Sequence, residues 1–147
     1  MTKQTKYEEL IPQIKSLIAG ESDQIANLSN ISAAITACFG HHWTGFYLVK
    51  ENELVLGPFQ GPVACTRIGF GKGVCGKAWS DNNTIIVNDV TQFIGHIACS
   101  PHSKSEIVIP LVRNNDVWAV LDIDSSELNT FDHIDKLYLT RLCELIP

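Results

Sequence analysis

The chain has 147 residues, 45% of them hydrophobic, which suits a single domain with a sizeable core. Its 11 basic and 16 acidic side chains give a net charge of −5 and no basic patch, so neither nucleic acid nor an anionic membrane is an expected partner. No apolar run approaches the ~20 residues of a membrane span and the first residues do not resemble a signal peptide, so we expect a cytoplasmic protein.

Two helices are expected at the start of the chain. Residues 6–19 carry apolar side chains at helical spacing, and Gly20 follows as a stop signal. Ser22 is the expected N-cap of a second helix that ends at Gly40. The apolar face of this second helix comprises Ile25, Leu28, Ile31, Ile35 and Cys38. We therefore expect Cys38 to fill core rather than to react.

The middle of the chain changes to the pattern of strands. GFYLVK at 45–50 and LVLGPFQ at 54–60 are separated by the polar ENE and predict a hairpin. IVIPLV at 107–112 and VWAVLDID at 117–124 flank RNND and predict a second one. IIVNDV at 85–90 predicts a further short strand.

A final helix is expected after Asp132, which is a plausible N-cap, and Cys143 lies beside its apolar face as a structural residue. There is no internal repeat or low-complexity linker. The whole chain, residues 1–147, is therefore interpreted as one α+β domain, a central antiparallel sheet flanked by N-terminal and C-terminal helices.

Five cysteines in a protein without an export signal are expected to be mostly reduced thiols. They form no CxxC pair and no closely spaced Cys/His cluster, so no metal site is expected. Three of them, Cys65, Cys75 and Cys99, lie in or beside two long connections between the sheet segments. Long irregular connections in a compact domain are usually functional.

The stretch GHIACSPHSKSE at 95–106 places Cys99 in a polar loop, although a structural cysteine would be expected inside the apolar run that follows. We interpret Cys99 as a reactive thiol. Cys75 lies among glycines, and a helix beginning near Gly76 would favour its thiolate; the alternative is a turn in which the small residue is a cysteine. Cys65, considered alone, could equally be a strand residue in the core.

Carboxyl groups gather near the same region. Asp122 and Asp124 are two residues apart at the end of a strand, so their side chains point to the same face, and Glu106 precedes the partner strand. Carboxylates in a partly buried pocket repel one another, which raises the pKa of at least one and keeps a proton available near neutral pH. The alternative is a solvated pair at a strand end, although aspartate is depleted in strands.

The motifs FYLV, LVLGPFQGPVAC, GKGVCG, GHIAC, SEIVIPL and VLDIDS, in this order and at these separations, resemble the free methionine-(R)-sulfoxide reductases, enzymes built on a GAF domain. The resemblance is strongest over residues 20–145. It implies reduction of the free amino acid methionine-(R)-sulfoxide to methionine, as protection and repair after oxidative stress. It also implies thioredoxin, and ultimately NADPH, as the reductant, no bound cofactor, and a homodimer.

Carried over residue by residue, the resemblance makes Cys99 the nucleophile that attacks the sulfoxide sulfur and becomes a sulfenic acid. Cys65 would resolve it as a Cys65–Cys99 disulfide, and Cys75 would be a secondary resolving or relay cysteine. Glu106 and Asp124 would contact the sulfoxide oxygen as proton-donating acids. The third acid of the family's pocket, Asp122, would bind substrate.

Other residues near these motifs allow two interpretations. Trp43 and Tyr47 could supply an apolar wall for the substrate methyl group, as resembling enzymes do, or Trp43 could simply cover the sheet. His96 and His102 flank Cys99, and we favour a surface or loop-ordering role for them over a role as acid or base. Ser100 stands where many relatives carry an acid, which removes a charge beside Cys99.

A GAF module that binds a small molecule or senses thiol oxidation without turnover is the competing hypothesis. Turnover of a stoichiometric substrate distinguishes the enzyme from both.

Overall fold

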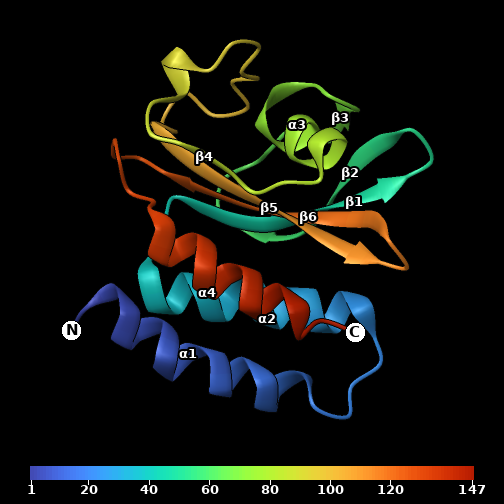
Figure 1. The fold of residues 1–147 in the computed structure, drawn as a ribbon, viewed down its shortest axis with the longest axis vertical. Helices are drawn as coiled ribbons and strands as arrows, with labels where there is room; N and C mark the ends of the chain where they lie inside the picture. Colours follow the sequence, from blue (N-terminus) through green and yellow to red (C-terminus); the bar gives the residue numbers. More distant parts are fainter.

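The structure is a computed structural model that describes all 147 residues. A sheet lies in the middle, with three helices below it and a shorter helix and two long connections above it (Figure 1). The lower helices are α1 (Lys3–Ile18), α2 (Gln24–Phe39) and α4 (His133–Glu144), and α2 and α4 lie between the sheet and α1. No helix has both the length and the apolar character needed to cross a membrane.

The helix ends follow local hydrogen bonding. The second helix is capped by Asp23, whose carboxylate accepts from the main-chain N–H of Ala26 at 2.9 Å, so the expectation that Ser22 is the cap is wrong. A carboxylate suits this position because its negative charge also interacts favourably with the partial positive charge at the N-terminus of the helix. Gly40 ends the helix in the left-handed conformation, with φ of 66°, as predicted.

The helical cysteines lie as expected. Cys143 is buried in the core between the sheet and the lower helices, and Cys38 packs at the edge of the same core. Ile25 is 53% exposed, so it does not belong to the apolar face assigned to it.

The sheet has six strands in the order β3-β2-β1-β6-β5-β4, and every neighbouring pair is antiparallel. Both predicted hairpins are confirmed. The expected strand at 85–90 ends early because Asp89 caps a short 3₁₀ helix, η1 (Val90–Gln92). The strands are β1 (Trp43–Lys50), β2 (Glu53–Gln60), β3 (Arg67–Gly69), β4 (Ile85–Val87), β5 (Ser105–Arg113) and β6 (Asp116–Ser125).

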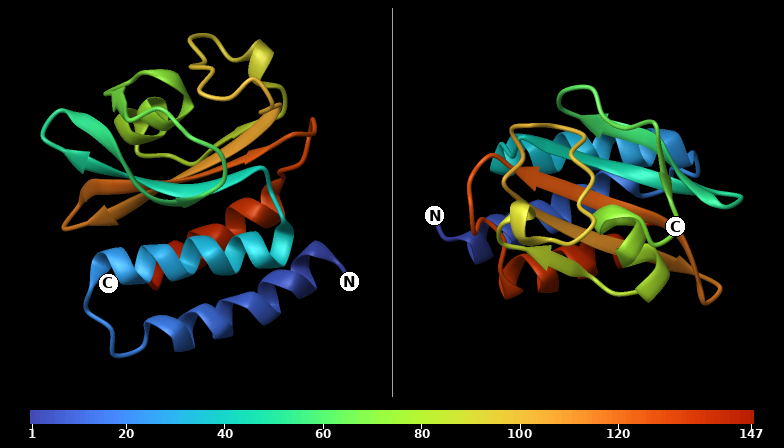
Figure 2. Two further views of the ribbon diagram at one scale, coloured as in Figure 1. Left: turned by 180° about the vertical axis from the view of Figure 1, so that it is seen from behind. Right: turned by 90° about the horizontal axis from the view of Figure 1, so that it is seen from above.

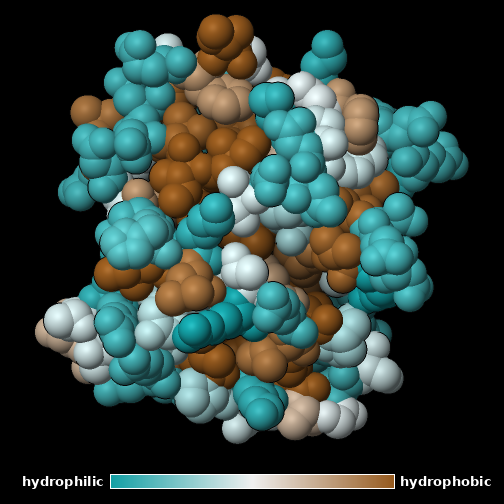
Figure 3. All heavy atoms as spheres, viewed as in Figure 1, coloured by the Kyte–Doolittle hydropathy of each residue, from teal (hydrophilic) through white to brown (hydrophobic).

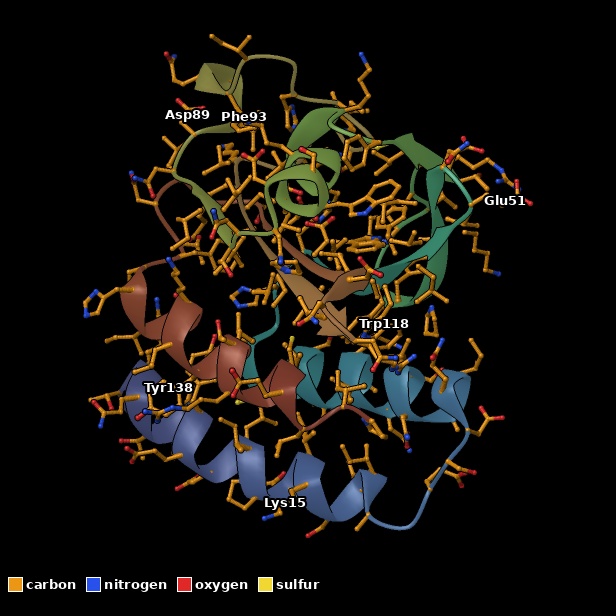
Figure 4. All side chains as sticks on the ribbon, turned by 45° about the vertical axis from the view of Figure 1, so that its right-hand side comes forward. Lys15, Glu51, Asp89, Phe93, Trp118 and Tyr138 are labelled. Carbon is orange, nitrogen blue, oxygen red and sulfur yellow. A yellow bond between two sulfur atoms is a disulfide. The ribbon has the colours of Figure 1, made fainter.

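The two faces of the sheet have different partners because side chains alternate along each strand. Phe46, Leu121 and Ile107 belong to the face that packs on the lower helices. Tyr47, Val120 and Val108 belong to the opposite face, which α3 (Gly73–Asp81) covers. In Figure 4 the labelled Tyr138 and Lys15 lie in the lower helices, and Asp89 and Phe93 lie in the layer above the sheet.

The N-terminal helix is fixed to the last helix by one buried carboxylate. Asp135 is 1% exposed; it lies 2.6 Å from the Lys3 ammonium and accepts a 2.6 Å hydrogen bond from the Tyr7 hydroxyl. Its side chain also accepts from the main-chain N–H of Asp132 at 2.9 Å, completing a capping box at the start of α4. The lower layer therefore holds the sheet rigidly from one side.

Candidate active site

The strand register brings the three predicted acids together. Glu106 on β5 is paired with Asp124 on β6, and Asp122 lies two residues further along β6. Trp43 on β1 is paired with Asp124 from the other side. Because side chains two apart share a face, all three carboxyls point to the upper side of the sheet, away from the lower helices.

Two of these carboxyl residues, Glu106 and Asp122, are buried, and Asp124 is half-buried. Glu106 is 5% exposed and Asp122 is 6% exposed. Desolvation raises the pKa of Glu106, Asp122 and Asp124 well above the usual range, and repulsion from a neighbouring carboxyl raises each pKa further. The Ser103 hydroxyl donates a 3.1 Å hydrogen bond to Asp124. The interpretation as a solvated pair is therefore wrong, and the surroundings favour the protonated form of these carboxyls.

A disulfide joins the two long connections above the acids. Cys65 and Cys99 are bonded, with their Cα atoms 5.4 Å apart and a sequence separation of 34. This is the pair that the family resemblance implies. The segments after β2 and after β4 both pass over the upper face of the sheet (Figure 2, right). Cys38, Cys75 and Cys143 remain free thiols.

A pocket lies between the acids and the disulfide. Its empty space, including the part open to solvent, is about 560 Å³. The Cys99 side of the disulfide lines it, whereas Cys65 does not. Apolar atoms gather at the surface of this upper part of the molecule (Figure 3), where Val63 and Ile97 line the pocket and are 89% and 38% exposed.

Trp43 and Tyr47 form one side of the pocket and also anchor the connection above it. They are 4% and 2% exposed, and Trp43 stacks on Phe59 with ring centroids 5.1 Å apart. The Trp43 indole N–H donates to the carbonyl of Pro62 at 3.1 Å. The Tyr47 hydroxyl donates to the carbonyl of Cys65 at 2.8 Å, which positions the disulfide. Trp43 therefore both lines the pocket and packs against neighbouring aromatic rings, while its role as a wall for the substrate methyl group stays a prediction.

Cys75 lies deeper than its glycine-rich surroundings suggested. The helix α3 begins at Gly73 rather than near Gly76, which places Cys75 in the first turn with 4% exposure. Burial and then the charge of Asp122 raise the pKa of the Cys75 thiol well above its ordinary value. The expectation of a favoured thiolate is therefore wrong. Gly76 is required for close packing, because a Cβ there would collide with the main-chain oxygen of Gly69.

One set of side chains could geometrically hold a cation. Ligand atoms of Cys75, Glu106 and Asp122 all lie within 4.8 Å of one another. The raised pKa of each group keeps it protonated, and a protonated thiol or carboxyl is a poor ligand. Sequence spacing could not indicate this set because its members come from a helix and two strands.

Histidines complete the lining of the pocket. The Nε2 atom of His96 lies 3.8 Å from a carboxyl oxygen of Glu106, and burial lowers the pKa of His96. His42 also lines the pocket, with its Nε2 3.1 Å from the Ser100 hydroxyl. Sequence reasoning missed His42, since it precedes Ser100 by 58 residues and no motif includes it. His102 does not line the pocket.

Comparisons with known proteins agree with this geometry. The GAF domain family matches residues 28–146. The chain is 57% identical to GAF domain-containing protein A of Dictyostelium discoideum, with coverage of 99% of this chain and 92% of the relative. It is 45% identical to the free methionine-R-sulfoxide reductase of Escherichia coli, with coverage of 97% and 87%.

A solved structure resembles the whole fold. It is the free methionine-R-sulfoxide reductase of Neisseria meningitidis in complex with its substrate. The TM-score is 0.98 at 50% identity, with coverage of 99% of this chain and 89% of that chain.

Proposed function

Because the chain belongs to the free methionine-R-sulfoxide reductases of the GAF domain family, we propose that the pocket above the sheet is where it reduces L-methionine-(R)-sulfoxide to L-methionine. The observation that carries this assignment is the position of the Cys65–Cys99 disulfide beside a pocket lined by three carboxyl groups, two of them buried. The reaction needs both parts, since a thiol must accept the oxygen and an acid must protonate it.

Cys99 is the nucleophile in this proposal. Support comes from the pocket lining, which includes Cys99 but not Cys65. After reduction of the disulfide, the Cys99 thiolate attacks the sulfoxide sulfur while an acid protonates the oxygen. The hydroxyl passes to the Cys99 sulfur, and the products are methionine and a sulfenic acid on Cys99.

Glu106 and Asp124 are the proposed proton donors, and Asp122 is the proposed substrate-binding acid beside them. Three ionised carboxylates would repel an approaching thiolate, so the reaction requires at least one to be protonated at the start. Their raised pKa values meet that requirement. Each catalysed proton transfer typically contributes ~10²–10⁴-fold to a rate.

Cys65 resolves the sulfenic acid in this proposal. Its thiol attacks the Cys99 sulfur, the disulfide forms and the oxygen leaves as water. A dithiol reductant, which we propose is thioredoxin supplied ultimately by NADPH, then reopens the bond by exchange. Cys75 is buried beside Asp122 with a raised pKa, which makes it a slow thiol and suits only a secondary resolving or relay role.

The substrate binds between the acids and the aromatic side of the pocket. Trp43 and Tyr47 offer an apolar surface for the methyl group, and main-chain groups of the two connections face its ammonium and carboxylate. We further propose a cytoplasmic location, since three of the five cysteines are free thiols, and a homodimer as the resemblance implies. Light scattering would measure the oligomeric state.

The experiment that tests the function is NADPH consumption in a coupled assay with thioredoxin and thioredoxin reductase. The R and S forms of free methionine sulfoxide are offered separately. We expect turnover of the R form alone, and its loss in Cys99→Ala. Cys38→Ala is the matched control, because Cys38 lies away from the pocket and its replacement should leave the rate unchanged.

Absence of turnover with either form, in the presence of an active reductant system, would contradict the enzymatic function. Binding of the sulfoxide without turnover would then favour a sensing module.

A further inference from the structure

We propose that His96 carries protons between bulk water and the carboxyl group of Glu106, and so reprotonates the buried acid after each turnover. The proposal rests on the proposed function, because it assigns a route to a proton that this reaction consumes inside the pocket. His96 would not touch the sulfoxide itself.

The position of His96 fits this role. Its Nε2 lies 3.8 Å from the Glu106 carboxyl oxygen, a separation that one bridging water or a small side-chain rotation converts into a hydrogen bond. The His96 side chain is 16% exposed and that of Glu106 is 7% exposed, so the imidazole reaches solvent to a greater extent than the acid does. No other lysine, arginine or histidine nitrogen lies within 4.0 Å of the three carboxyls.

The proton balance creates the need for a relay. Reduced Cys99 loses its thiol proton to solvent, and Glu106 then gives a proton to the oxygen that becomes the sulfenic acid hydroxyl. Glu106 is left as a buried carboxylate, and no further round can begin until it regains one proton. Disulfide formation with Cys65 releases water, and reduction by a dithiol restores both thiols. The cycle then balances when Glu106 takes back from solvent the one proton that the Cys99 thiol released there.

The other groups that face the same pocket are less suited to carry this proton. Asp122 from β6 is a buried acid, Asp124 from β6 is a half-buried acid that accepts a hydrogen bond from Ser103, and the Cys75 thiol from α3 is 4% exposed. His42, from the segment before β1, is hydrogen-bonded to Ser100. Burial lowers the pKa of His96, so at neutral pH the ring is neutral and can accept a proton from water at one nitrogen while it gives one up at the other.

The test measures methionine formed in a single turnover by pre-reduced enzyme, using wild type, His96→Gln and His96→Ala. His102→Gln is the matched control, since it changes a histidine of the same connection that does not line the pocket. Each enzyme is mixed with substrate in two ways. In the first, it is held at pH 7 throughout. In the second, it is held at an alkaline pH that lowers the wild-type rate at least tenfold and is then jumped to pH 7.

When held at pH 7, all variants should react within about threefold of wild type, because Glu106 already carries its proton. After the jump, both His96 variants should be slower than wild type by about tenfold or more. This slowing is smaller than the ~10²–10⁴-fold that general acid catalysis itself contributes to a rate. Imidazole should restore the rate of His96→Ala, and the His102 control should match wild type.

Equal rates of the His96 variants and wild type after the jump would overturn the relay. An equal slowing under both conditions would also overturn it, because His96 would then bind or orient the substrate. Failure of the function itself would be distinct, since wild type would form no methionine.

Discussion

His41 gives a stability prediction that depends on pH. Its ring stacks on Phe39, with centroids 5.5 Å apart, and lies 5.1 Å from Phe131. Its Nε2 is buried without a hydrogen-bond partner. Burial lowers the pKa of His41 to about 4 from 6.5, so the folded protein holds the ring neutral while the unfolded chain protonates it. The perturbation is His41→Phe, which keeps an aromatic ring and removes the titration.

The sign follows from proton binding. Between pH 6.5 and 4 the unfolded chain binds more protons at residue 41, so the free energy of unfolding falls as pH falls through this window. The pKa of His41 is about 4 in the folded protein, against 6.5 for an exposed histidine. At ~1.4 kcal/mol per pH unit, this difference lowers the free energy of unfolding by about 3.4 kcal/mol at a pH below both values. At pH 5 the loss is about 2 kcal/mol, and near pH 7 it is almost nil.

Urea unfolding of the reduced proteins, followed by circular dichroism at pH 7 and pH 5, measures this difference. The stability of His41→Phe relative to wild type should rise by about 2 kcal/mol between pH 7 and pH 5. The acids titrate alike in both proteins, so their contributions cancel in the comparison. An equal stability difference at the two pH values would refute the reasoning.

Three further predictions concern the acids and the packing. Glu106→Gln should lower kcat by ~10²-fold or more. Wild-type activity should fall as pH rises through the raised pKa values of the three acids. Initial rates measured against pH test both expectations, and a flat profile for the wild type would contradict the acid role. Asp135→Asn should cost about 3 kcal/mol in urea unfolding because it removes the buried charge that pairs with the Lys3 ammonium and accepts from the Tyr7 hydroxyl, and a loss below ~1 kcal/mol would argue against this role of Asp135. Gly45→Ala should raise KM, since the new Cβ would collide with the Cβ of Phe59 and lie 2.8 Å from the Trp43 ring, so that both aromatic side chains must shift; an unchanged KM would argue against the aromatic wall.

Much of the fold could be predicted from the sequence because its signals are local. The alternation of apolar and polar residues predicted both hairpins, and Gly40 predicted the end of α2. The short strand β3 and the early start of α3 at Gly73 were missed, since both depend on contact with other elements. Three residues are too few for a periodic pattern to indicate a strand.

The residues of the candidate site could be predicted from the sequence better than their burial could. The acids could be assigned to one face from strand alternation, yet their burial depends on the two connections that cover them. The same covering buries Cys75, which reversed the expectation of a favoured thiolate. His42 and His96 reach the pocket from distant parts of the chain, and only the folded register places His96 beside Glu106.

The central claim is that Cys99 takes the sulfoxide oxygen. The most direct measurement uses the reduced double variant Cys65→Ser, Cys75→Ser, which lacks both candidate resolving thiols. One equivalent of the R form is added, methionine is quantified, and the sulfenic acid is trapped with dimedone for peptide mass spectrometry. We predict up to one methionine per chain and an adduct on Cys99. Methionine formation with an adduct on another cysteine, or no methionine at all, would contradict the account.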